Sequence, residues 1–214
     1  MAVLSISRQF GAGGKTLGEM VAKRLGYTFV DEAILHKMAE KANVSVRWVE
    51  AVEKELGGRL MRFISQLVPS SFIERHVGES GADFDEKKYK EFAEAVVREV
   101  ADQDDVVILG RGSQFILRDR FNTVRVLLVA EAPDRIKFMM DNYQLDENQA
   151  RNMVAARTRM RERFLKEFYP GDANDPSLYH MVINTSQVPL DIAEAQIEEL
   201  VLGTIDRVTK PIWD

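Results

Sequence analysis

A short stretch near the start of the chain carries the residue types that bind phosphate groups. It reads Gly11, Ala12, Gly13, Gly14, Lys15 and Thr16. Glycines let a turn curl so that its backbone N–H groups converge on phosphate oxygens. A lysine and a hydroxyl directly after them can reach the β- and γ-phosphates of a nucleotide and a Mg²⁺ ion. Residues 11–16 therefore predict a site for ATP and Mg²⁺, with Lys15 on the phosphates and Thr16 on the metal.

The match to the usual phosphate-loop pattern is incomplete at its first position. Gln9 stands five residues before Gly14, where the pattern has a glycine. The flanking segments are those that the mechanism needs, because the apolar run 2–7 predicts a strand and residues 15–25 have helical spacing. The N-terminus of that helix would add its partial positive charge. Strand, glycine-rich turn and helix together favour a phosphate-binding loop over a chance glycine turn.

Apolar runs alternate with helical patterns along the rest of the chain. The expected strands are residues 2–7, 27–30, 106–109, 124–130 and 181–184. The expected helices are 15–25, 32–42, 45–56, 86–102, 113–118, one that opens near Pro133, 146–168 and 189–208, whereas residues 59–85 are not assigned. This alternation predicts an α/β fold with a doubly wound, five-stranded parallel sheet. Ligands bind such sheets beyond the carboxyl ends of the strands, which is where the 8–16 loop, Asp31 and Arg111 fall.

Three residues outside the loop are candidates for binding a phosphate acceptor. Arg111 lies between two glycines after the strand 106–109, where its guanidinium could grip an anionic group through two hydrogen bonds. Asp31 could orient the acceptor or act through a metal-bound water, and capping of the following helix is an equal alternative. Lys37 lies one and a half helical turns further on, where its side chain could face the same pocket or lie on a solvated surface.

Arginines recur in the helix predicted at 146–168. Arg157 and Arg161 share one face by their four-residue spacing, and Arg159 and Arg163 share another. Such charge runs are usually solvated faces. One face could instead close over ATP as a lid and supply arginines to the transition state. We therefore expect Arg157 and Arg161 to be catalytic residues.

The composition narrows the choice of function. The chain has 214 residues, which suits one domain with insertions, and its net charge of −5 gives no reason to expect a nucleic acid polymer or a membrane as partner. It contains no cysteine, which excludes disulfides and suits a reducing cytoplasm. No predicted strand ends in the Asp that holds Mg²⁺ in many phosphate-loop hydrolases, which favours a small-molecule kinase. We expect a cytoplasmic protein with a small-molecule partner, and a homodimer remains open.

Four segments resemble the cytidylate kinase-like family, in the nucleoside monophosphate kinase branch of the P-loop NTPases. They are residues 6–16, 29–31, 108–112 and 179–186. The resemblance implies a single P-loop kinase domain that uses ATP and Mg²⁺. Its core would comprise residues 1–42, 101–142 and 173–214, with a helical acceptor-binding insertion at 43–100 and an Arg-rich lid at 143–172.

The acceptor-binding parts depart from those of authentic cytidylate kinases. Those enzymes resemble Asp-Thr-Gly-Ala-x-Tyr-Arg where this chain has residues 31–37, so that Lys37 replaces an arginine for the acceptor phosphate. They carry Gly-Arg-Asp where this chain has Gly-Arg-Gly at 110–112, and Thr158 replaces an Asp in the lid. We expect ATP-dependent phosphoryl transfer to a nucleoside monophosphate such as CMP or dCMP, or to a related small anionic acceptor. A kinase of a non-nucleotide metabolite and a non-catalytic module that binds nucleotide as a regulatory signal are the alternatives.

Overall fold

The computed structural model describes residues 2–31 and 86–208 of the chain. The chain divides into two compact units, of which one comprises Met1–Phe29 with Asp105–Asp214 and the other comprises Val30–Asp104. The first unit contains the phosphate loop, Arg111 and the Arg-rich helix. The helices expected at 32–42 and 45–56, and most of the insertion expected at 43–100, lie outside the described residues. That insertion therefore stays a prediction.

The five predicted strands form one sheet. They are β1 (Val3–Arg8), β2 (Thr28–Val30), β3 (Val106–Leu109), β4 (Thr123–Val129) and β5 (Met181–Asn184). Their order is β2-β3-β1-β4-β5, and β1 pairs in parallel with β3 on one side and with β4 on the other. The chain therefore changes direction across the sheet at β1. Such a switch point is where ligands bind in sheets of this kind, and the phosphate loop leaves β1 there.

Apart from one 3-10 helix that was not predicted, the helices of the described residues agree closely with those expected from the sequence. They are α1 (Gly14–Leu25), α6 (Glu86–Asp102), α7 (Ser113–Ile116), α8 (Ala132–Tyr143), α9 (Glu147–Phe168), the 3-10 helix η2 (Pro176–Leu178) and α10 (Leu190–Val208). The prediction for α7 was too long, because that helix ends two residues before residue 118. Within residues 2–31 and 86–208, no helix combines the length and apolar character needed to cross a bilayer.

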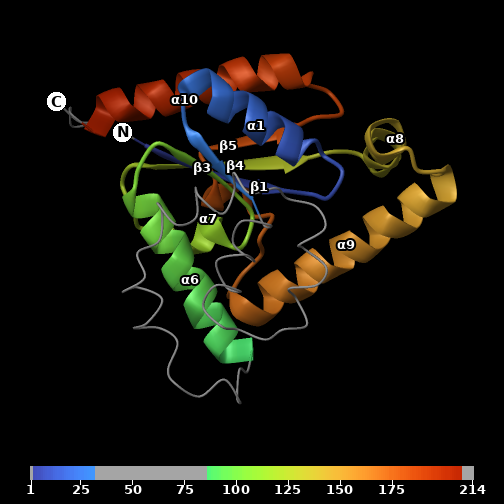
Figure 1. Ribbon diagram of the computed structural model, residues 1–214, viewed down its shortest axis with the longest axis horizontal. Helices are drawn as coiled ribbons and strands as arrows, with labels where there is room; N and C mark the ends of the chain where they lie inside the picture. The colour runs from blue at the N-terminus through green and yellow to red at the C-terminus, as the bar shows by residue number, and fades with distance from the viewer. Residues whose placement is uncertain (1, 32–85, 209–214) are drawn as a thin grey trace, which may run out of the picture. The chain divides into compact units, whose positions relative to one another are not determined.

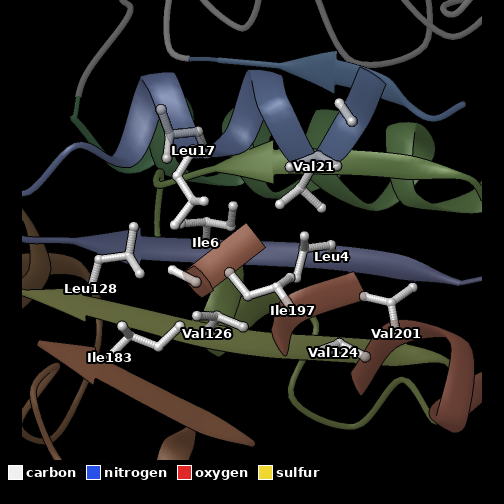
Figure 2. Packing of buried hydrophobic residues seen from close by; sticks show 14 of the residues in the cluster. Leu4, Ile6, Leu17, Val21, Val124, Val126, Leu128, Ile183, Ile197 and Val201 are labelled. Atoms are coloured by element: carbon white, nitrogen blue, oxygen red, sulfur yellow. The ribbon is translucent and has the colours of Figure 1, made fainter. Parts of the chain in front are cut away.

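Alternate residues of β1 face opposite sides of the sheet, and helices cover both. Leu4 and Ile6 belong to a buried cluster with side chains of α1, β4 and α10 (Figure 2). Ser5 points the other way, where its Oγ lies 2.7 Å from Oγ of Ser113 in α7. The helices α1 and α10 pack against each other on the first face (Figure 1). This arrangement confirms the doubly wound parallel sheet that the sequence predicts.

A histidine ties the start of β5 to β4. The backbone N–H of His180 donates to the carbonyl of Arg125 at 2.8 Å, and Nδ1 of His180 accepts from the backbone N–H of Arg125 at 3.0 Å. Partial burial of the ring lowers the pKa of His180, and the nearby charge of Arg125 lowers it further by a smaller amount. A proton on Nδ1 would remove the second hydrogen bond, so the folded protein favours neutral histidine.

We expect part of the free energy of unfolding to depend on neutral His180. Because the folded pKa is lower than the unfolded one, this stabilisation is present above the unfolded pKa of about 6.5 and disappears as the pH falls through the folded pKa. Urea unfolding at pH 7.5 and pH 5.5 measures the effect. The loss on acidification should be smaller in His180→Asn, whose side-chain oxygen can accept the same bond without titrating. Equal losses in the two proteins would contradict the assignment.

Candidate functional site

The phosphate loop opens directly into the first turn of α1. Gly13 precedes the helix in a left-handed conformation, with φ of 75°, and Gly11 also has a positive φ of 89°. Gly13 has no side chain with which to cap the helix, so the N–H groups of the first turn point toward the space beyond the loop. Lys15 and Thr16 lie in that turn with exposed side chains. This is the geometry that binds phosphate oxygens at a helix N-terminus.

Two side chains fasten the loop to the sheet. Gln9, which occupies the unusual first position, accepts a hydrogen bond through Oε1 from the backbone N–H of Ala130 at 3.0 Å. The hydroxyl of Thr185, just after β5, donates to the carbonyl of Ala12 at 3.2 Å. Gln9 therefore does what a glycine cannot, because it ties the start of the loop to the end of β4. These contacts restrict the loop before any ligand arrives.

Arg135 of α8 lies against the loop, a position that the sequence did not reveal. A Cβ atom added to Gly11 would lie 2.8 Å from Cβ of Arg135, so only a glycine allows this approach. Nη1 of Arg135 donates to the hydroxyl of Thr158 in α9 at 3.3 Å. Burial lowers the pKa of Arg135, opposed by the charge of Glu162. Arg135 thus connects the loop with α9, and it contacts the threonine that replaces the expected lid Asp.

The two arginines predicted to be catalytic have different surroundings. Arg157 is exposed, and its Cζ lies 5.9 Å from the centre of the Phe10 ring, beside the phosphate loop. Arg161 is half-buried and donates to Oγ of Ser7 at 3.0 Å and to Oδ1 of Asn174 at 3.3 Å. Arg161 therefore holds α9 to the end of β1, whereas Arg157 stays exposed beside the phosphate loop.

The electrostatic setting of Arg161 supports this anchoring role. Burial lowers its pKa, and the opposing influences of Tyr179, Glu162 and Asp172 raise it. A guanidinium nevertheless stays charged at neutral pH. A buried charge is stable only where hydrogen bonds replace its water, and Ser7 and Asn174 provide such bonds.

Arg111 lies in an unusual turn after β3. Gly110, Arg111 and Gly112 all have left-handed backbones, with φ of 79°, 57° and 73°. Two glycines adopt this conformation without penalty, but an arginine there is strained. Strain of this kind concentrates at functional sites, where the surrounding contacts maintain it. The turn therefore supports Arg111 as a functional residue rather than an ordinary surface arginine.

Arg8 joins this turn to the phosphate loop. A Cβ added to Gly14 would lie 2.8 Å from Cγ of Arg8, and one added to Gly110 would lie 3.2 Å from its Cζ. The stem of Arg8 thus packs on the first residue of α1, and its guanidinium packs on the turn that carries Arg111. The structure in this way brings together the 8–16 loop and Arg111, as the sequence predicts. Arg8 was not predicted from the sequence to be part of this site, although it belongs to a segment that carries the family resemblance.

The remaining two candidates are not placed at this site. Asp31 directly follows β2 and is half-buried, and it belongs to the unit Val30–Asp104. Lys37 lies outside the described residues. Their roles toward the acceptor stay predictions.

Comparisons with known proteins agree with this architecture. A family model described as the cytidylate kinase-like family matches residues 3–187. Similar solved structures include an uncharacterized protein from Eubacterium ventriosum ATCC 27560, with 20% identity and a TM-score of 0.65 over 94% of this chain and 98% of that one. They also include a shikimate kinase from Acinetobacter baumannii in complex with shikimate, with 15% identity and a TM-score of 0.50 over 95% of this chain and 94% of that one.

A gluconokinase from Sinorhizobium meliloti 1021 has the same fold, with 14% identity and a TM-score of 0.50 over 99% of this chain and 95% of that one. No curated protein matches the sequence. At these identities the likeness to solved structures establishes the fold alone, which is that of P-loop kinases. The family match covers most of the chain and includes the phosphate loop, the Arg111 turn and Thr185, and it indicates a phosphotransferase that acts on a small acceptor. The chain belongs to the cytidylate kinase-like family.

Proposed function

We propose that this protein transfers the γ-phosphoryl group of ATP to the phosphate of a nucleoside monophosphate, with CMP and dCMP as the first acceptors to test. The observation that carries the proposal is the contact that Arg8 makes with both Gly14 and Gly110. This contact brings the turn that carries Arg111 beside the loop that would hold the phosphates of ATP. Phosphoryl transfer needs this juxtaposition of a donor phosphate site and a cationic acceptor site.

In the reaction, an oxygen of the acceptor phosphate attacks the γ-phosphorus. The bond between that phosphorus and the β–γ bridging oxygen breaks, and ADP leaves with the bond's electron pair. The protein contributes mainly position and charge to this step. Lys15 and the N–H groups of residues 11–16 would hold the β- and γ-phosphates. Thr16 would hold Mg²⁺, which when bound neutralises charge on the phosphates.

The arginines would act on the other groups. Arg111 would grip the anionic part of the acceptor, and exposed Arg157 would approach the γ-phosphoryl group as negative charge spreads over its oxygens. Arg161 supports Arg157 indirectly, because its bond to Ser7 fixes α9 beside the loop. Asp31 would orient the acceptor. An acceptor that is itself a phosphate is already a nucleophile, and it offers Arg111 the geometry that a guanidinium binds best.

A hydroxy acid is the second candidate acceptor. The fold is shared with a shikimate kinase and a gluconokinase, and a carboxylate also suits the bidentate geometry of Arg111. The sequence of residues 31–37 departs from that of authentic cytidylate kinases, which is consistent with a hydroxy acid as acceptor. A regulatory module that binds ATP without transfer is the remaining alternative.

An ADP-release assay across a panel of acceptors separates these functions. The panel contains the common nucleoside monophosphates and small hydroxy acids that carry a carboxylate. Turnover that depends on CMP or dCMP supports the proposal, and turnover only with a hydroxy acid replaces it. If calorimetry detects ATP binding but no acceptor promotes ADP release, the regulatory function takes its place.

Substitution of Arg111 tests the acceptor side of the site. Arg111→Lys keeps one positive charge and a similar backbone preference but loses the two-pronged guanidinium. We expect kcat/KM for the acceptor to fall by about tenfold to a hundredfold, because a charged hydrogen bond contributes about 1.5–3 kcal/mol. Binding of an ATP analogue should change little, and Arg111→Ala should be more severe. Arg118→Lys, at an exposed arginine after α7, is the matched control.

Equal losses of ATP-analogue binding and acceptor use in Arg111→Lys would place Arg111 at the donor site instead. If neither quantity changes in either substitution, Arg111 is only a turn residue.

A further inference from the structure

Three aromatic side chains from separate elements form a cluster near the turn that carries Arg111. Phe115 comes from α7, Phe164 from the last part of α9, and Tyr169 is the residue that follows α9. The rings of Phe115 and Tyr169 are stacked, with centres 5.0 Å apart and planes 5° apart. Phe164 meets Tyr169 edge-on, with centres 6.3 Å apart. We call Phe115, Phe164 and Tyr169 the aromatic platform.

The platform contacts the turn at two neighbouring residues. A Cβ added to Gly112 would lie 2.6 Å from Cζ of Tyr169 and 2.9 Å from its hydroxyl oxygen, so the backbone of the turn lies directly against that ring. The Cζ atom of Arg111 lies 6.0 Å from the centre of the Phe164 ring. This separation is within the range of a cation–π interaction. One ring therefore supports the backbone of the turn, and the next faces the guanidinium that the turn presents.

These contacts restrict the direction of the Arg111 side chain. Arg111 has a strained left-handed backbone and a long side chain with many rotamers. Neither feature gives the guanidinium a defined direction without surrounding contacts. To bind an anion through two parallel hydrogen bonds, the guanidinium plane must be oriented before the anion arrives. A flat aromatic face opposite the guanidinium restricts that orientation.

We propose that Phe164 is a positioning residue for Arg111, an inference that rests on the proposed role of Arg111 at the acceptor. Phe164 belongs to α9, which also carries Arg157 beside the phosphate loop. One helix therefore places the exposed arginine on the nucleotide side and orients the arginine on the acceptor side. Because both residues belong to α9, a movement of this helix as a whole would change the surroundings of both arginines.

Phe164→Leu removes the aromatic face while it keeps an apolar side chain of similar reach. Phe164→Tyr keeps the face and is the conservative variant. The matched control is Phe168→Leu, one turn further along α9. Phe168 packs edge-on against Phe164, with ring centres 4.9 Å apart, so its substitution tests the loss of aromatic packing at this end of the helix. The control makes the same chemical change at the same end of the same helix, and it leaves the Phe164 ring that faces Arg111 in place.

We expect KM for the acceptor to rise by about threefold to tenfold in Phe164→Leu, the range of a partly exposed cation–π interaction. KM for ATP should stay within about twofold, and Phe164→Tyr should restore most of the acceptor KM. Phe168→Leu should resemble the wild type. Equal increases in both KM values, or equal effects of the two leucine substitutions, would show that Phe164 only stabilises the helix end and would overturn the proposal.

Nuclear magnetic resonance gives a readout that does not depend on activity. The Hε signal of Arg111, assigned by its loss in Arg111→Lys, should carry a ring-current shift from Phe164. That shift should be lost in Phe164→Leu and kept in Phe168→Leu. If the wild type transfers phosphate to no acceptor, the proposed function fails, and this signal alone decides whether Phe164 orients Arg111. An Hε signal that is unchanged in Phe164→Leu overturns the inference even in a fully active enzyme.

Discussion

Lys15→Ala is expected to abolish phosphoryl transfer and to leave the protein folded. Lys15 lies exposed in the first turn of α1, so its removal opens no cavity, and alanine favours a helix at least as well as lysine. The lost charge would otherwise stabilise the phosphates as negative charge moves during transfer. Removal of one such group typically costs several kcal/mol in the transition state, or about a hundredfold or more in rate. The coupled ADP-release assay and a thermal unfolding curve measure both parts.

Lys23→Ala is the matched control for this experiment. Lys23 lies in the last turn of the same helix and is also exposed. Because it faces the opposite end of α1 from the phosphate loop, its removal should leave turnover near that of the wild type. Near-normal turnover in Lys15→Ala would overturn the assignment of residues 11–16 as the ATP site. Loss of turnover in both variants would show that the substitutions disturb α1 as a whole and that the effect is not specific to Lys15.

Gly112→Ala is expected to lower the free energy of unfolding by about 2–5 kcal/mol. Gly112 has a φ of 73°, which costs an alanine on the order of 1–2 kcal/mol. Its new Cβ would lie 2.6 Å from Cζ of Tyr169, and a forced fit of this kind costs about 1–3 kcal/mol more. Tyr169 cannot move aside easily, because its ring is buried and stacked on Phe115. Urea unfolding monitored by circular dichroism measures the change.

Gly203→Ala provides the comparison within the same chain. Gly203 lies in α10 and is exposed, and among the described residues an added Cβ would have no atom within 4 Å other than those of its chain neighbours and its own helix backbone. An alanine there should stabilise the helix by up to about 1 kcal/mol. The two glycine substitutions should thus change stability in opposite directions. If Gly112→Ala is as stable as Gly203→Ala, the turn does not lie against Tyr169 and the positioning of Arg111 must have another origin.

The parts of this protein that the sequence predicts well are those set by local pattern. β3 and β5 were predicted residue for residue, because each contains a short apolar run that polar residues or glycine bound. The phosphate loop was recognised because glycine spacing, Lys15 and the flanking strand and helix are adjacent in sequence. Arg111 became a candidate because two glycines flank it. In each case the physical cause lies within one continuous stretch of the chain.

Tertiary structure alone decided what lies opposite these residues. Helical spacing places Arg157 and Arg161 on one face, but it does not reveal that Arg161 reaches Ser7, 154 residues away, while Arg157 stays exposed. The approach of Arg135 to Gly11 and of Phe164 to Arg111 also joins segments that are distant in sequence. Periodicity specifies which side chains share a face of their own helix. The partner of that face is set by the order of strands in the sheet and by the packing of helices upon it, and neither is encoded in any one stretch of the chain.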